Sequence, residues 1–160
     1  MYTEYKKSIE RILKNSCLET SMYHLIQKTI EDNTKYYSLD ISQTQTRNRF
    51  HKVYNTPAGI SDIAVFSKYD KLLFYIEVKW FVRNQTEPSI YKQLLGQSDK
   101  HKKIMFTDGL NWKFYKLENG ELIVDWEVNL GNYPEEKGKI IWNNYDEWKK
   151  LTKLLKNIRC

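Results

Sequence analysis

The sequence has few of the residues that mark disordered, disulfide-rich or zinc-binding proteins. Its 160 residues include 6 glycines, 3 prolines, 2 cysteines and 3 histidines. The low glycine and proline content argues against extended disorder. Cys17 and Cys160 lack the spacing of a metal motif, so a reduced intracellular pair is expected. The histidines are far apart in the sequence and give no reason to assign a histidine metal site.

Long apolar runs are also lacking, and we expect no leader segment. The longest apolar run, residues 72–82, contains two charged residues and is too short to cross a bilayer. No signal peptide opens the chain. We therefore expect no membrane association and a cytoplasmic location, in a prokaryotic cell or in a virus-infected host cell. With no repeat or linker, residues 1–160 are expected to form a single domain with a substantial core.

The sequence is rich in basic and aromatic residues. The formal net charge is +6, and there are 12 tyrosines and 5 tryptophans. A basic chain favours a polyanionic partner such as nucleic acid. A soluble protein with a lysine-rich surface has the same composition, so charge alone does not choose between the two interpretations.

Two β-forming runs predict a hairpin with unusual charges. Residues 60–66 and 72–82 are strongly apolar and are joined by a polar turn. Asp62 lies in the first run, whereas Glu77 and Lys79 lie in the second. Because side chains alternate along a strand, Glu77 and Lys79 are expected to share one face.

The charges of this hairpin have two interpretations. Buried charge is costly unless it is paired or bound to a metal, and two carboxylates beside an ammonium would hold a divalent cation. Alternatively, Asp62 is a turn residue, and the other two charges form a surface ion pair on a half-solvated strand. Alternation places three apolar side chains on the same face, which argues against the surface pair: Leu73, Tyr75 and Phe81.

The order Asp62, spacer, Glu77-x-Lys79, after a leading Gly59, resembles the PD-(D/E)XK nuclease superfamily. The resemblance implies that the acidic pair binds Mg²⁺, with Mn²⁺ substituting, and that Lys79 orients or activates the attacking water. Magnesium prefers hard oxygen ligands, and the carbonyl of Val78 would add a third from the same strand. Residues 58–61 depart from the pattern, because many family members carry proline before the aspartate.

The rest of the chain predicts alternating helices and strands. Apolar periodicity, turn signals and a capping motif give helices over 4–14, 18–32, 88–100 and 145–158, a strand or loop over 35–41, a strand over 104–107 and a hairpin around Asn119-Gly120. The first two helices could also be one kinked helix. This order predicts an α/β fold, a central mixed β-sheet flanked by helices with a restriction-endonuclease-like core.

Residues 93–117 are similar to the region after the catalytic lysine in type I restriction subunit nuclease domains and their small relatives. Family members often carry Gln-x-x-x-Tyr on the helix there, and this chain has Gln93 with Gln97 in the place of the tyrosine. The resemblance implies that Gln93 supports the catalytic site. Some related nucleases place a helix glutamate near the metal, but for Glu19 a solvated helix charge is the expectation.

A polar loop supplies candidate DNA contacts. Arg47, Arg49 and Lys52, with His51, could grip phosphates, since cationic side chains on loops commonly position a duplex. An ordinary solvated loop would have the same composition. We expect DNA, in double-stranded form, as the partner. A homodimer would place two sites for a double-strand cut, although nothing in the sequence demonstrates one.

The sequence therefore predicts a metal-dependent deoxyribonuclease that hydrolyses phosphodiester bonds. One alternative is a catalytically silent relative that keeps the fold to bind DNA or protein. An intact Asp62, Glu77 and Lys79 argue against it, because a silent copy has no reason to keep all three. The other alternative is a basic, genome-coating protein, which predicts salt-sensitive binding without metal dependence.

Overall fold

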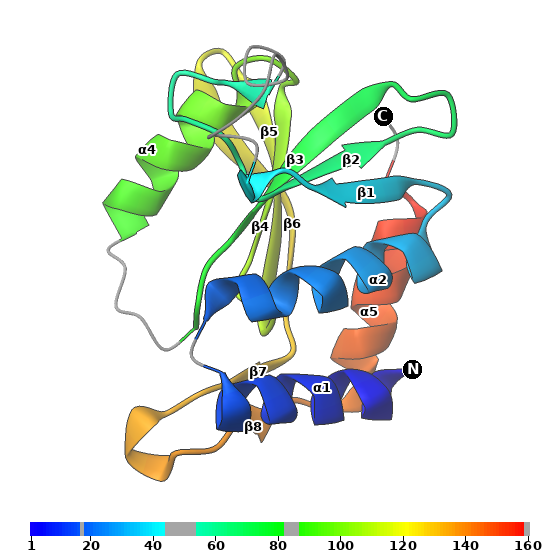
Figure 1. The fold of residues 1–160 in the computed structure, drawn as a ribbon, viewed down its shortest axis with the longest axis vertical. Helices are drawn as coiled ribbons and strands as arrows, with labels where there is room; N and C mark the ends of the chain where they lie inside the picture. Colours follow the sequence, from blue (N-terminus) through cyan, green and yellow to red (C-terminus); the bar gives the residue numbers. More distant parts are fainter. Residues whose placement is uncertain (17, 44–53, 82–86, 159–160) are drawn as a thin grey trace.

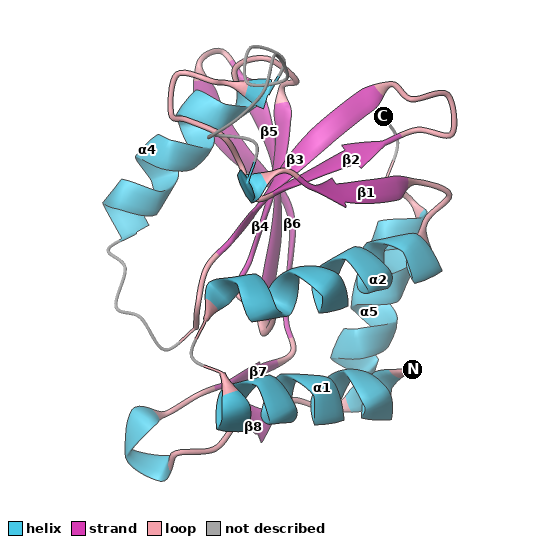
Figure 2. Cartoon of the chain, viewed as in Figure 1, coloured by secondary structure: helices cyan, strands magenta, loops and turns pink. Residues whose placement is uncertain are grey.

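A six-stranded mixed sheet lies between helices on its two faces (Figures 1 and 2). The structure is a computed structural model that describes residues 1–16, 18–43, 54–81 and 87–158. In spatial order the strands are β1 (Tyr37–Asp40), β2 (Ile63–Phe66), β3 (Leu72–Val78), β4 (Lys103–Thr107), β5 (Asn111–Glu118) and β6 (Glu121–Asn129). Strands β3 and β4 are parallel, whereas the other neighbours are antiparallel. The predicted α/β class with a central mixed sheet is confirmed.

The helices are divided between the two faces. They are α1 (Tyr2–Asn15), η1 (Glu19–Met22), α2 (Tyr23–Asn33), α4 (Glu87–Ser98) and α5 (Tyr145–Lys156). Figure 1 shows α4 on one side of the sheet, with α2 and α5 on the other. Shorter elements follow β6, namely β7 (Gly131–Asn132), η3 (Glu135–Lys137) and β8 (Ile141–Trp142). Within the described ranges, no helix is long and apolar enough to span a membrane.

Strand β2 explains why the sheet needs helices on both faces. All four of its residues are buried. Ile63 and Val65 pack into the core shared with α2 and α5, whereas Ala64 and Phe66 pack into the core beneath α4. Alternation along a strand sends neighbouring side chains to opposite faces, so an apolar run without polar positions indicates a strand covered on both sides.

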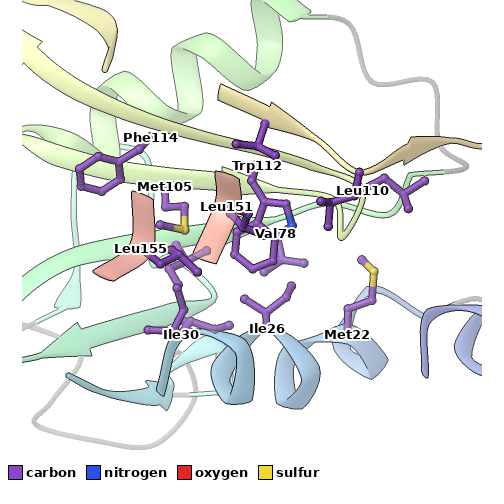
Figure 3. Close-up of a cluster of buried hydrophobic side chains, with 14 of the residues drawn as sticks. Met22, Ile26, Ile30, Val78, Met105, Leu110, Trp112, Phe114, Leu151 and Leu155 are labelled. Carbon is purple, nitrogen blue, oxygen red and sulfur yellow. The ribbon is translucent and has the colours of Figure 1, made fainter. Parts of the chain in front are cut away.

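The larger core lies against the end of β3 that carries the candidate site. Figure 3 shows side chains from η1, α2, β3, β4, β5 and α5 meeting there, including Met22, Ile26, Ile30, Val78, Met105, Trp112, Phe114, Leu151 and Leu155. Val78 is fully buried and stands between Glu77 and Lys79 in the sequence. Packing of Val78 on this face therefore directs its two charged neighbours to the other face.

Helix α4 is the crossover that parallel strands require. It connects β3 to β4 and packs over both strands. Leu94 of α4 lies in the smaller core with Tyr75 of β3 and Ile104 of β4. The helix thus covers the face of β3 on which Tyr75 lies, and this is also the face of Glu77.

One predicted turn and one predicted helix cap have the expected geometry. Asn119 and Gly120 join β5 to β6 with φ values of 51° and 85°, the left-handed conformations that a two-residue hairpin of this type requires. The Asn144 side chain accepts hydrogen bonds from the backbone amides of Asp146 and Glu147 at the start of α5.

The first two helices are separate rather than one kinked helix, because α1 ends at Asn15.

The predicted apolar neighbours of Glu77 need correction. The register of β2 and β3 pairs Val65 with Phe74 and Phe66 with Leu72, which skips Leu73. This irregularity shifts the alternation, and Leu73 packs into the larger core on the opposite face. Phe81 also packs against the larger core, because it lies beyond the end of β3. Of the three residues, Tyr75 alone lies in the smaller core.

We expect Leu155→Ala to lower the free energy of unfolding by about 2–5 kcal/mol, since it leaves a cavity in the larger core. Leu155 is fully buried, whereas Leu18 is 63% exposed. Leu18→Ala is the matched control and should change stability by less than about 0.5 kcal/mol. Urea denaturation followed by tryptophan fluorescence measures both. Equal effects of the two substitutions would contradict the observed packing of α5.

Candidate active site

The pairing of β2 with β3 brings two carboxylates together. Ile63 is opposite Ile76 in this antiparallel pair. Asp62 directly precedes β2, so continuing this register brings it near Glu77, although the two are 15 positions apart in the sequence. The charge of Asp62 acts on Glu77. The hairpin register therefore creates the acidic pair that the sequence motif predicts.

Glu77 is buried among hydrogen-bond donors, with only 2% of its surface exposed. Its Oε1 accepts hydrogen bonds from Lys79 Nζ and from Gln93 Nε2, the latter at 2.6 Å. Its Oε2 accepts one from Gln97 Nε2 at 2.8 Å. Gln93 and Gln97 are four residues apart on α4 and therefore share a helix face. One ammonium and two amides offset the cost of burying this carboxylate.

Asp62 is held from two other elements. Its Oδ1 accepts a hydrogen bond from the Tyr23 hydroxyl at 2.5 Å, and its Oδ2 accepts one from the backbone amide of Val78 at 2.8 Å. Tyr23 opens α2, and Val78 ends β3. The carboxylate is thus fixed between a helix on one face of the sheet and the neighbouring strand.

Burial and like charge raise the pKa of both carboxyl groups. Burial is the largest cause for Glu77, and the nearby charge of Asp62 adds to it, so the pKa of Glu77 rises from 4.5 to about 7 despite its contacts with Lys79 and Gln97. Burial also raises the pKa of Asp62, against the hydrogen bonds from Tyr23 and Val78 and the charge of Lys79. Carboxyl groups tuned in this way are typical of sites that bind cations or transfer protons.

Lys79 and Tyr23 remain protonated in this environment. Burial acts to lower the pKa of Lys79, but the charge and hydrogen bond of Glu77, with the charges of Glu19 and Asp62, raise it overall. The carboxylates therefore outweigh desolvation. Burial raises the pKa of Tyr23, and its hydrogen bond to Asp62 raises it further. Lys79 is a cation, and Tyr23 is a hydrogen-bond donor.

Glu19 is not the solvated helix charge that the sequence suggested. Its Oε2 accepts a hydrogen bond from the backbone amide of Trp80 at 3.0 Å, which ties η1 to the segment after β3. Its charge also acts on Lys79. A glutamate four residues before Tyr23 would lie on the same side of a continuous helix. No feature of the sequence, however, shows that this side meets the β2–β3 hairpin.

The structure brings Asp62, Glu77, Lys79 and Gln93 together at one end of the hairpin. The side chains of Glu77 and Lys79 are 2% and 13% exposed, so their ion pair is not on the surface. Sequence reasoning did not assign Gln97, which binds the second oxygen of Glu77. It also missed Tyr23, because a tyrosine at an apolar position reads as a core residue. The catalytic and metal-binding roles of this cluster remain predictions.

The predicted DNA contacts Arg47, Arg49, Lys52 and His51 lie outside the described residues. A cavity of about 480 Å³ lies between α4 and the face of β4, β5 and β6. It is lined mainly by apolar and aromatic side chains, including Leu94, Phe106, Tyr115 and Leu122. None of the four catalytic candidates lines it. The case for chemistry therefore rests on the side-chain cluster and not on this cavity.

The donor set of the cluster suits magnesium. In the described part of the chain, no three histidine, cysteine or acidic side chains form a metal-binding group. Mg²⁺ needs fewer protein ligands, because it commonly binds one or two carboxylates and completes its octahedron with waters and substrate phosphate. Asp62 and Glu77 supply two carboxylates. Each Asp62 oxygen accepts one hydrogen bond from the described residues and retains capacity for another ligand.

Comparison with known proteins supports the fold. No family model and no curated protein matches the sequence. A chain in the cryo-electron microscopy structure of a DrdV–DNA complex is similar to this one, with a TM-score of 0.58 and 17% sequence identity. The match covers 98% of this chain and 14% of that chain. The protein thus spans a small part of the length of its structural neighbour, and the similarity concerns the backbone arrangement.

We expect Glu77→Gln to stabilise the protein progressively, relative to the native chain, as pH rises from 5 to 8. The pKa of Glu77 is raised in the folded state from 4.5 to about 7, so the native fold binds this proton more tightly than the unfolded chain does. The resulting stability is present below pH 4.5 and is lost as pH rises through about 7. Glutamine has no such proton, and the relative gain should be roughly 1–3 kcal/mol.

Urea denaturation at pH 5, 6, 7 and 8 measures this difference. Glu121→Gln is the control, because Glu121 is exposed at the tip of the β5–β6 hairpin. The control should follow the native pH dependence. If Glu77→Gln also ran parallel to the native protein at all four pH values, Glu77 would not have the raised pKa.

Proposed function

We propose that this protein is a Mg²⁺-dependent deoxyribonuclease of the PD-(D/E)XK type, formed by residues 1–160 as a single domain. The observation that carries the proposal is the hydrogen-bonded cluster of Asp62, Glu77 and Lys79, in which Glu77 is buried and the other two are partly buried. Two carboxylates and an ammonium at the end of one hairpin, enclosed by donors from α4 and α2, are costly to maintain for stability alone. A cation bound by the two carboxylates would offset the cost of placing these charges together.

The proposed chemistry assigns each side chain a task. Asp62, Glu77 and the carbonyl of Val78 would hold Mg²⁺, and Mn²⁺ would substitute for it. The bound ion would supply charge neutralisation at the phosphate and a lower pKa for the attacking water. Lys79 would orient this water, since its ammonium already lies at Glu77. Gln93 and Gln97 would keep the Glu77 carboxylate in place.

DNA is the proposed substrate. The formal charge of +6 favours a polyanion, and the structural neighbour was solved as a complex with DNA. A duplex is the form proposed, with Arg47, Arg49 and Lys52 contacting phosphates beside the cleavage site. Two copies of the chain would be needed to place two sites on opposite strands, so a homodimer belongs to the proposal only for double-strand cuts.

We expect the native protein to cut supercoiled plasmid in Mg²⁺ and to be inactive in EDTA. Lys79→Ala should lower the cleavage rate by about 100-fold or more, because a positioned side chain that assists proton transfer contributes at least this much. Lys71→Ala is the matched control. Lys71 is exposed in the turn between β2 and β3, and its loss should leave the rate unchanged.

The same assay tests the alternative of a silent DNA-binding or genome-coating protein. Such a protein would bind DNA in a salt-sensitive manner without regard to Mg²⁺ or Lys79, and it would leave the plasmid intact. The lengths of products from linear duplex would then separate trimming of ends from internal cuts. Cleavage that survives in Lys79→Ala would place the chemistry elsewhere in the chain.

A further inference from the structure

Tyr23 contacts the site from the far side of the sheet. Its ring packs in the larger core, and the residue is 5% exposed. Its hydroxyl lies at the edge of this apolar core and donates a hydrogen bond to Asp62 Oδ1 at 2.5 Å. Because the core fixes the ring, the hydroxyl is held in position without depending on solvent or on a mobile side chain.

The helix that carries Tyr23 is tied to the hairpin at a second point. Glu19, one turn earlier, accepts the backbone amide of Trp80 at 3.0 Å. Tyr23 therefore meets the start of β2, and Glu19 meets the segment just after β3. These two contacts fix the junction of η1 and α2 against both strands that carry the acidic pair.

Asp62 needs this contact to have a defined orientation. It precedes β2, and its side chain has a single other anchor among the described residues, the Val78 amide at Oδ2. One hydrogen bond holds one oxygen and leaves the carboxylate able to turn about it. The second hydrogen bond, at Oδ1, fixes the plane of the group while leaving acceptor capacity on both oxygens.

We propose that Tyr23 is a positioning residue, which holds the Asp62 carboxylate in the orientation that binds a divalent cation. The inference rests on the proposed function, since it concerns the same site. The inference adds a residue that is not part of the sequence motif. Tyr23 belongs to α2, and its ring packs in the larger core. Hydrogen-bond partners of ligating carboxylates commonly contribute 10–100-fold to metal affinity.

A purely structural role for Tyr23 is the competing explanation, and Tyr5 offers a matched comparison. Tyr5 is 3% exposed, packs in the same core and donates its hydroxyl to the carbonyl of Gly109 at 2.6 Å. Removing the hydroxyl of either tyrosine breaks one hydrogen bond made by a buried ring, to Gly109 from Tyr5 and to Asp62 from Tyr23. Only Tyr23 contacts a residue of the acidic pair, so only its removal should change metal binding.

The test measures Mn²⁺ binding without DNA, by titration calorimetry and by the electron paramagnetic resonance signal of free Mn²⁺. Tyr23→Phe should weaken binding about tenfold. Tyr5→Phe should bind as the native protein does, and thermal denaturation checks that both variants are folded. Plasmid cleavage by Tyr23→Phe should need correspondingly more Mg²⁺ for half-maximal rate and should approach the native rate at saturation.

A double-mutant comparison assigns the effect to Asp62. In an Asp62→Asn background, adding Tyr23→Phe should weaken the residual Mn²⁺ binding by less than twofold, because the group that Tyr23 positions has already been changed. An effect of the same size in both backgrounds would overturn the proposal. So would equal losses in Tyr23→Phe and Tyr5→Phe, since these would reflect stability alone.

The outcomes separate this inference from the proposed function. The native protein could bind Mn²⁺ and cut plasmid while Tyr23→Phe binds Mn²⁺ with unchanged affinity. This result would overturn the role of Tyr23 but would leave the proposed nuclease function standing. No Mn²⁺ binding and no cleavage by the native protein would overturn both proposals.

Discussion

The site depends on one constraint: two carboxylates, Asp62 and Glu77, are enclosed together at one end of the β2–β3 hairpin. Pairing of Ile63 with Ile76 brings Asp62, which directly precedes β2, near Glu77; the Glu77 carboxylate is buried, and Asp62 is partly buried. Like charges in such a place repel each other and lose their hydration. The pair is tolerable only if donors are placed at each oxygen. The hairpin supplies two of them, Lys79 and the Val78 amide, and the others come from α2 and α4.

Each face of the sheet supplies a different part of this support. The crossover helix α4 lies over β3 and directs Gln93 and Gln97 at Glu77. On the opposite face, α2 brings Tyr23 to Asp62. The parallel pairing of β3 with β4 makes the crossover helix necessary, so the topology that completes the sheet also covers the acidic pair. Fold and site are therefore consequences of the same arrangement of strands.

The cluster also explains why an interpretation from charge alone is insufficient. Lys79 is not a surface cation in this protein, because its side chain is only 13% exposed and its ammonium is paired with Glu77. The ion pair holds the lysine beside the buried Glu77 carboxylate. A surface pair of the same two residue types would contribute little to stability and would position nothing. The tripeptide Glu77-Val78-Lys79 is of a common type, and it is a candidate catalytic site here because its charged side chains are largely withdrawn from solvent.

The sequence by itself determined the α/β class, most elements and the grouping of Asp62, Glu77 and Lys79, because alternation and helical periodicity are local properties of the chain. It misplaced Leu73, since one irregularity in the register reverses the face of a strand residue. It also could not assign Gln97, Glu19 or Tyr23 to the site. Their partners lie 20, 61 and 39 positions away. Only the packing of helices on the two faces decides which of many polar side chains reaches a buried carboxylate.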